Sequence, residues 1–294
     1  MGMISTAEAA KRWGVSERSV RNYCAQGRVP GAVMVGKTWS IPDVATKPQR
    51  SNARNPESAL LQRLREEREL SMPGGIYHRV QIELTYNSNH IEGSRLTRDE
   101  TRLIFETSTI RADSPRNVND IIETVNHFRC IDYIIDHAQD PISQDMVKEL
   151  HRMLKTSTRD AGAEWFAVGA YKRLPNEVGG RMTTAPEDVE REMDELIRTY
   201  EDLANASMRD VVAFHAQFER VHPFQDGNGR VGRLLMFKEC LRWGIVPFII
   251  TDELKFYYYR GLSEWSEEEG FLMDTCLAAQ DAFKRALDRF GIPW

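Results

Sequence analysis

Residues 222–233 read HPFQDGNGRVGR, and this stretch governs how the rest of the chain is interpreted. It opens with a histidine, a base with a pKa near neutral that can take a proton from an attacking hydroxyl. Asp226 supplies a carboxylate of the kind that holds Mg2+ on phosphate oxygens. Two glycines flank an asparagine directly after it, so backbone N–H groups can converge there into an anion-binding nest. Together these groups predict chemistry on a nucleotide polyphosphate.

The residues that follow this nest are predicted to form a helix over 228–243. The N-terminus of such a helix would also point at the phosphates. Arg230 and Arg233 lie three positions apart, so their side chains project side by side from it. A capped turn before an ordinary surface helix is the alternative, because His, Asp and Asn are common at turns. The complete string makes that alternative improbable, since each element would have to arise by chance at this spacing.

The stretch resembles the signature of the Fic family, His-x-Phe-x-Asp/Glu-Gly-Asn-Gly-Arg-x-x-Arg, at every specified position. Family members are mostly AMP transferases, which move AMP from ATP onto a hydroxyl of a target protein. The resemblance implies that ATP and Mg2+ are bound, that His222 is the general base and that Asp226 is the Mg2+ ligand. It extends over roughly residues 75–265.

The resemblance also distributes the phosphates of ATP over the rest of the motif. Arg230 would hold the β-phosphate and Arg233 the γ-phosphate, while Phe224 would anchor the loop. The nest would be formed by three consecutive residues, Gly227, Asn228 and Gly229.

A second stretch ends a predicted amphipathic helix over about 76–93, where Gly93 is a plausible stop. Glu92 is oddly placed, because an anion at a helix C-terminus opposes the helix dipole and calls for a cationic partner. An ordinary helix with a polar last turn is the alternative. The segment resembles the inhibitory motif of Fic proteins, Ser/Thr-x-x-x-Glu-Gly/Asn, through Ser88, Glu92 and Gly93. That resemblance implies that Glu92 pairs with Arg233 in the place of the γ-phosphate.

Composition excludes several classes of protein. The chain has 294 residues and no apolar run of 18 or more, so no membrane span is expected. Its first residues lack the layout of a secretory signal, which favours a cytoplasmic protein. The cysteines are too few and too far apart for zinc or a disulfide scaffold, and we expect free thiols at Cys24, Cys130, Cys240 and Cys276. The other histidines show no metal spacing, and His151 and His215 are expected to be packed or to act as caps.

Residues 1–50 carry eight basic and three acidic side chains, whereas the whole chain has a net charge of −5. A basic head on an acidic body suggests separate partners. Thr6 is predicted to cap one helix, which Gly14 ends, and Ser16 a second one, which Gly27 ends. A hairpin turning at residues 36–37 is predicted to follow.

Two short helices joined by a tight turn, followed by a hairpin, resemble the winged helix-turn-helix of MerR-type regulators and phage excisionases. Arg18, Arg21 and Asn22 could then reach DNA bases or phosphates from the second helix. A small protein-interaction module with a solvated basic face is the alternative.

The expected organisation is therefore a winged helix-turn-helix head over 1–47, a linker with a charged helix over 48–73, and a Fic domain over 74–294. The fold class is mainly α. Further helices are predicted in the body at 119–138, 143–156, 186–200, 207–221 and 267–290.

One hairpin is predicted in the body, over 168–184 with its turn near 177–180, against the alternative of a surface loop. In Fic proteins this position holds a flap that aligns an extended target segment by strand addition. Its expected clamp residues are Val168, Tyr171, Leu174 and Met182. The three tyrosines 257–259 fall where the family places residues near adenine, although they could equally belong to the core.

The leading hypothesis is an autoinhibited protein adenylyltransferase with a head that binds DNA. Removal of AMP from a target is the alternative among enzymes, because the inhibitory glutamate of the family can position water. A transcription regulator that only senses nucleotide is the alternative from another class. A homodimer is one possible assembly.

Overall fold

The computed structural model describes residues 2–25, 27–48, 57–111 and 115–294. It separates into two compact units, one formed by Met1–Arg54 with Ile197–Ala206 and the other by Asn55–Leu196 with Ser207–Trp294. No helix among the described residues is both long and apolar enough to cross a membrane. Residues 49–56, part of the segment over 48–73 that was expected to hold the linker and charged helix, lie outside the described residues.

The described residues 2–25 and 27–48, here called the N-terminal segment, form two helices and three short strands. Helices α1 (Thr6–Trp13) and α2 (Glu17–Ala25) are joined by a three-residue turn in which Gly14 has φ of 65°. Strands β1 (Met3–Ser5), β3 (Thr38–Pro42) and β2 (Val33–Val35) form an antiparallel sheet in that order. A small core of buried side chains lies between helices and sheet: Ile4, Ala9, Ala10, Val20, Tyr23, Cys24, Val29 and Ile41.

The first helix begins one residue earlier than the sequence suggested. Ser5, not Thr6, is its N-cap, and the Ser5 hydroxyl accepts a hydrogen bond from the Glu8 backbone N–H. Thr6 is buried inside the first turn, and its hydroxyl donates to Glu17 at 2.7 Å. The difference arises because β1, which the sequence did not predict, runs directly into α1.

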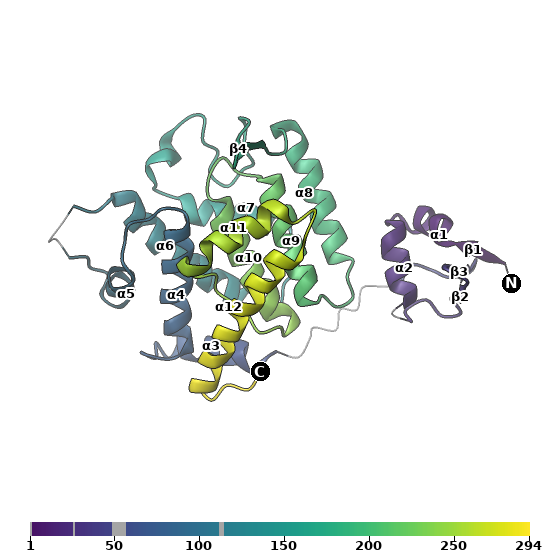
Figure 1. Ribbon diagram of the computed structural model, residues 1–294, viewed down its shortest axis with the longest axis horizontal. Coiled ribbons are helices and arrows are strands. Elements are labelled where there is room, and N and C mark those ends of the chain that lie inside the picture. Colours follow the sequence, from purple (N-terminus) through teal and green to yellow (C-terminus); the bar gives the residue numbers. More distant parts are fainter. Residues whose placement is uncertain (1, 26, 49–56, 112–114) are drawn as a thin grey trace. The chain divides into compact units, whose positions relative to one another are not determined.

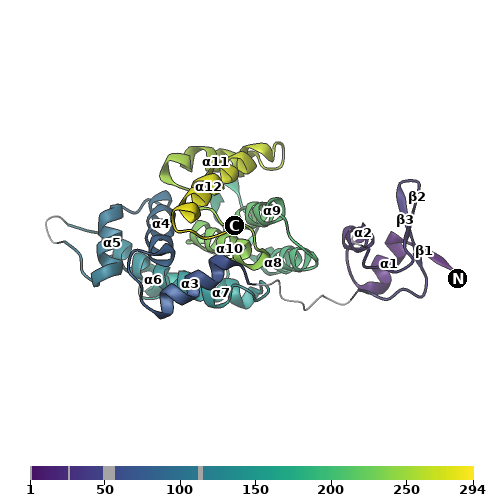
Figure 2. The same ribbon diagram turned by 90° about the horizontal axis from the view of Figure 1, so that it is seen from below.

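The body is helical, and α10 (Asn228–Trp243) runs through its middle in both views (Figures 1 and 2). It packs against α4 (Ile76–Ile91), α6 (Val118–Asp136), α7 (Gln144–Lys155) and α9 (Met208–Val221). Buried residues occur on every face of α10, as expected for a helix at the centre of a bundle. The HPFQDGNGRVGR stretch therefore enters the core of the body at its helical end.

The remaining helices of the described body surround this centre. They are α3 (Ala59–Glu69), α5 (Arg98–Thr107), α8 (Pro186–Glu201), α11 (Lys255–Glu264) and α12 (Gly270–Arg289). Helix α5 lies at the edge of the body in both views (Figures 1 and 2). Neither α5 nor α11 was predicted from the sequence. The described residues also include short 3-10 turns at Arg159–Gly162 and Asp252–Leu254.

Side-chain caps explain where several of these helices start. Ser58, Ser143 and Ser207 each accept a hydrogen bond from a backbone N–H of the first turn. Thr97 does the same for α5, and Glu100 reaches back to the Thr97 N–H, which completes a capping box.

The hairpin of the body is much shorter than predicted. Strands β4 (Glu177–Val178) and β5 (Arg181–Met182) pair around Gly179 and Gly180, so the turn lies where it was expected. Residues 168–176 form no strand, and their polar groups bind the neighbouring loop instead. Of the expected clamp residues, Leu174 and Met182 are exposed, whereas Val168 and Tyr171 are partly buried.

Candidate active site

His222 sits at the C-cap of α9, in a left-handed backbone conformation with φ of 51° and ψ of 62°. Its backbone N–H donates to the Phe218 carbonyl at 2.9 Å, which ends the helix there. Burial lowers the pKa of the imidazole to about 4, and the positive charge of Lys172 acts in the same direction. The ring is therefore neutral near pH 7, as a general base must be.

Buried side chains fix the conformation of the loop after His222. The Asn228 side chain accepts from the Phe224 N–H and donates to the Phe224 carbonyl, both at 2.8 Å. The Phe224 ring is fully buried and stacks on the His151 ring, with centroids 3.9 Å apart. His151 Nε2 also hydrogen-bonds the Asp226 carbonyl at 3.1 Å. The Asn228 side chain thus shapes the loop in which the nest is predicted.

The carboxylate of Glu92 lies at the N-terminus of α10. A Cβ added to Gly229 would stand 2.2 Å from Oε1 of Glu92, so only glycine leaves room for that oxygen. The same oxygen binds Nη2 of Arg233 at 2.7 Å. Burial acts to raise the pKa of Glu92, but Arg233 and Arg230 together hold it below its usual value. Glu92 therefore lies as an anion where the helix N-terminus attracts one.

Arg233 is almost wholly occupied by its neighbours. Its Nε donates to Ser88 Oγ at 3.0 Å and its Nη2 to the Ser88 carbonyl at 2.9 Å. The side chain is 3% exposed, and the Tyr258 hydroxyl lies 3.5 Å from Nη1. Helix α4 supplies the hydrogen-bond acceptors that hold the second arginine of the motif, and its C-cap residue Glu92 supplies the anion. Gly93, with φ of 96°, ends the segment in a conformation that favours glycine.

A second group of charges lies beside the first, and four side chains form it. The Glu123 carboxylate, on α6, contacts Nη1 of Arg230 with one oxygen and Nζ of Lys155 with the other. Lys155 also contacts Oδ2 of Asp226, and Nη2 of Arg230 lies 3.4 Å from the same oxygen. Burial acts to raise the pKa of Asp226, yet Arg230 and Lys155 lower it to about 2.

The side chain of Asp226 is suited to bind Mg2+ together with the phosphates of ATP. Its side chain is 49% exposed, and it offers a hard oxygen donor. Among the described residues, no three or more His, Cys, Asp or Glu side chains gather into a metal-binding group. Mg2+ at nucleotide sites is held by one or two carboxylates and completed by phosphate oxygens and water, so one carboxylate suffices.

The hairpin segment is tied to this loop through Lys172. Its Nζ donates to Asn176 and Thr183 at 2.7 and 2.5 Å, and its backbone N–H donates to the Pro223 carbonyl at 2.8 Å. Asn176 in turn donates to the Phe224 carbonyl at 3.1 Å. Burial lowers the pKa of Lys172 to about 8. The hairpin and the His222 loop are thereby placed relative to each other.

A cavity of about 1210 Å³ opens between the hairpin, α9 and α11. Glu219 and Arg220, directly before the His222 loop, line one side, and Met182 and Thr183 of the hairpin line another. Of the three tyrosines, Tyr259 lines this cavity and Tyr257 is exposed. Tyr258 is fully buried and hydrogen-bonds His215 at 2.6 Å, so it belongs to the core.

Glu219, which lines this cavity, has a strongly shifted pKa. Burial raises its pKa to about 8, against which Arg233 acts only in part. The Cα of Gly232 comes so close that an added Cβ would stand 2.6 Å from Oε1 of Glu219. The carboxyl is therefore held protonated near neutral pH.

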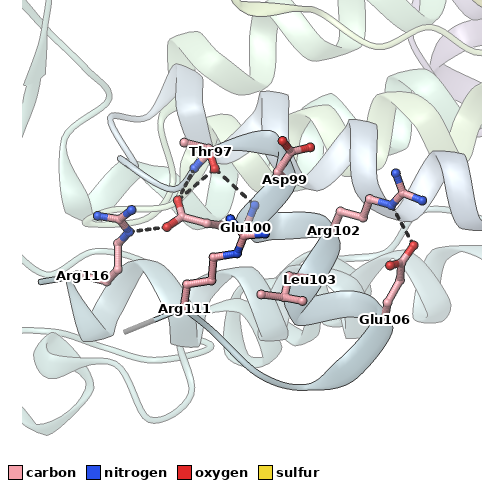
Figure 3. A pocket seen from close by; sticks show the side chains of 8 residues that line it. All are labelled: Thr97, Asp99, Glu100, Arg102, Leu103, Glu106, Arg111 and Arg116. Atoms are coloured by element: carbon pink, nitrogen blue, oxygen red, sulfur yellow. Dashed lines mark hydrogen bonds and ion pairs between the residues drawn. The ribbon is translucent and has the colours of Figure 1, made fainter. Parts of the chain in front are cut away.

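Another pocket, of about 330 Å³, lies on α5 away from these residues (Figure 3). Figure 3 shows Arg116 reaching Glu100 and Arg102 reaching Glu106, so these lining charges are satisfied by one another. No residue of the predicted site lies there.

The structure brings together the residues that the two motifs contributed, and it adds four that the sequence did not reveal: Glu123, Lys155, Lys172 and Glu219. These four come from separate segments and form no motif, so no local pattern could have indicated them. His151 and His215 are fully or almost fully buried, and all four cysteines are buried free thiols, as predicted.

The residues expected to contact DNA lie on α2. Arg18 and Arg21 are exposed, and Arg21 pairs with Glu17 at 2.6 Å on the preceding turn. Asn22 is partly buried. All three belong to the second helix of the N-terminal segment, where the prediction placed them.

Comparison with known proteins relates part of the body to a family. Residues 141–240 match the Fic/DOC family model. A protein adenylyltransferase Fic of Nematostella vectensis is 28% identical over 184 residues, which cover 61% of this chain and 42% of that protein. Protein adenylyltransferase fic-1 of Caenorhabditis briggsae is 30% identical over 183 residues, covering 60% and 35%. The chain spans about two fifths of the length of such curated relatives.

A solved structure supports the same fold. The Fic domain containing signaling protein of Bacteroides thetaiotaomicron superposes with a TM-score of 0.63 at 24% identity, covering 78% of this chain and 94% of that one. At this identity the likeness concerns the fold alone. The match of residues 141–240 and the similarity in sequence and fold agree, and the chain therefore contains a domain of the Fic/DOC family.

Proposed function

We propose that this protein is an adenylyltransferase that moves AMP from ATP to a hydroxyl group of a target protein. One observation carries the proposal: a neutral base, a partly exposed carboxylate and two arginines converge at the N-terminus of α10, beside a cavity of about 1210 Å³. The names of the relatives, protein adenylyltransferases, support the same activity.

In this proposal the backbone N–H groups of Gly227, Asn228 and Gly229 bind phosphate at the end of α10. Arg230 binds the β-phosphate and Arg233 the γ-phosphate. Asp226 holds the Mg2+ that neutralises charge on the phosphates. The cavity accepts the nucleoside, and its wall includes Tyr259, an aromatic ring of the type on which bases stack.

His222 then acts on the target. Its neutral imidazole takes the proton of a target hydroxyl as the oxygen attacks the α-phosphorus. The bond between that oxygen and the phosphorus forms, the bond from the phosphorus to the bridging oxygen breaks, and pyrophosphate leaves. The hairpin over 177–182, whose Met182 is 68% exposed, presents a strand edge to which an extended target segment can add.

Glu92 is proposed to inhibit this reaction. Its carboxylate lies 2.7 Å from the Arg233 guanidinium. It thereby occupies the cationic hydrogen-bond donor that the γ-phosphate would need. ATP would then bind in an unproductive pose. Removal of AMP remains the second enzymatic candidate, because an anion close to the nest, with a side chain that is 26% exposed, can orient water.

A second function is proposed for the N-terminal segment. Two helices joined by a three-residue turn and followed by a β-hairpin support a winged helix-turn-helix here, and so does the basic charge of the segment. We propose that α2 contacts DNA through Arg18, Arg21 and Asn22. A regulator that only senses nucleotide would use the same segment, but it would not need a neutral base at position 222.

The position of the label in ATP tests the enzymatic proposal. The Glu92→Gly variant should transfer label to itself or to lysate proteins from ATP labelled at the α-phosphate, and not from ATP labelled at the γ-phosphate. His222→Ala should lose this transfer, by roughly 10²- to 10⁴-fold. Transfer from γ-labelled ATP, or none from either, would reject an adenylyltransferase.

A further inference from the structure

Lys155 is a buried cation that contacts the proposed metal ligand, and no motif includes it. It is the last residue of α7, its side chain is 2% exposed, and its Nζ contacts both Glu123 and Oδ2 of Asp226. A cation this deeply buried requires anionic partners, because the cost of removing it from water is large. Glu123 and Asp226 provide them.

The position of Lys155 is fixed by its backbone. The Asn126 side chain donates to the carbonyls on either side of it, those of Leu154 at 3.0 Å and Thr156 at 2.8 Å. The Thr158 hydroxyl donates to the Lys155 carbonyl at 2.9 Å. Its charge therefore stays next to the loop, in contrast to that of an exposed lysine, which can turn away into solvent.

The path of the side chain brings it to the nest. A Cβ added to Gly227 would stand 3.6 Å from Cε of Lys155, so the end of the lysine passes directly beside the motif. The four side chains Arg230, Glu123, Lys155 and Asp226 carry two positive and two negative charges. Within this set, Lys155 and Arg230 both contact Oδ2 of Asp226.

We propose that Lys155 is a positioning residue that occupies Oδ2 of Asp226 and thereby competes with a divalent cation for that carboxylate. The proposal rests on the proposed function, in which Asp226 is the metal ligand. An oxygen that accepts from Nζ is a poorer metal ligand, and a divalent ion on either oxygen would share the carboxylate with a fixed positive charge. Lys155 thus weakens divalent binding, so that phosphates, which add negative charge, are needed to hold the metal.

The test is a titration with Mn2+ alone, followed by electron paramagnetic resonance of free Mn2+, on the full chain. Lys155→Met keeps the length of the side chain but removes its charge, and Glu123 retains Arg230 as a partner. The variant should bind Mn2+ about tenfold more tightly than the unchanged protein. Lys155→Arg, which keeps the charge, should bind Mn2+ as the unchanged protein does.

Two controls separate this effect from others. Lys148→Met removes the same charge two turns earlier on α7, where Lys148 lies over the Tyr171 ring at 4.4 Å, and it should leave Mn2+ binding unchanged. Thermal unfolding checks that each variant is folded. If Lys155→Met does not fold, Lys155→Gln, which can still donate to Glu123, replaces it with the same expected result.

Each outcome decides one question. If Lys155→Met binds Mn2+ no more tightly than the unchanged protein, or more weakly, the proposal that Lys155 competes with the metal is rejected. Lys155 would then orient Asp226 or bind phosphate instead. If binding tightens and Asp226→Asn then abolishes the gain, the inference holds. If Asp226→Asn leaves Mn2+ binding unchanged in every background, Asp226 is not the ligand, and it is this part of the proposed function that fails.

Discussion

Arg233 and Glu92 lie 141 positions apart in sequence, yet Nη2 of the arginine and Oε1 of the glutamate are 2.7 Å apart. The same oxygen lies against the Cα of Gly229, at the first turn of α10. One carboxylate therefore engages both the helix N-terminus and the second arginine of the motif. The N-terminus of a helix and a buried guanidinium each attract an anion, so a ligand that takes the place of this carboxylate is expected to be negatively charged.

Replacement of Glu92 by glycine should raise the proposed adenylyltransferase activity. Arg233 then becomes available to the γ-phosphate, and labelling from α-labelled ATP should rise above that of the unchanged protein. The pair also carries a desolvation cost, so only the direction of the change is predicted. Ser88→Ala is the matched control: it removes one acceptor of Arg233 but leaves the carboxylate, and it should activate less. Equal labelling by Glu92→Gly and the unchanged protein would remove the autoinhibition proposal.

The pH profile of the reaction should report on His222. Its pKa is lowered to about 4, and the base works in its neutral form, so activity is present above that pH and lost as pH falls through it. Between roughly pH 5 and 7 we expect kcat/KM to be nearly constant in the Glu92→Gly variant, whereas a histidine with an ordinary pKa of about 6.5 would lose most activity over that range. A half-maximal point near pH 6.5 would contradict the buried, neutral base.

Glu219 should make stability depend on pH. The folded-state pKa of Glu219 is about 8, above the ordinary value of 4.5. Its contribution to the free energy of unfolding is therefore fully present below about pH 4.5 and is lost as pH rises through 8. The Tm of Glu219→Gln minus that of the unchanged protein should therefore increase between pH 5 and 8.5. Glu187→Gln, at an exposed position on α8, should show no such increase. A pH-independent difference for Glu219→Gln would show that its carboxyl ionises normally.

DNA binding by the N-terminal segment should depend strongly on salt. If α2 lies on DNA, affinity falls as salt rises, because phosphate contacts release counterions. Arg18→Ala should weaken binding by the full chain and reduce the slope of log affinity against log salt by about one. Arg12→Ala serves as the control, since Arg12 lies on α1 and pairs with Glu8 at 2.8 Å. Absence of binding at low salt would favour a protein-interaction module.

The sequence alone determined the elements that depend on local chemistry. Serine caps, glycine stops and apolar periods placed α3, α4, α6–α10 and α12 close to their observed positions, because such signals act within a few residues. They also placed His222 at a helix end and the turn of the hairpin near 177–180, where it is observed at 179–180. Helices α5 and α11 were missed; they pack against α4 and α12, respectively.

Only the tertiary structure decided which charges meet. Glu123, Lys155 and Asp226 come from α6, α7 and the loop before α10, and nothing near any of them in the sequence indicates the others. The same holds for the burial that shifts the pKa values of His222 and Glu219. Burial and ion pairing depend on how helices pack across the whole body, whereas a motif records only the residues that lie next to one another along the chain.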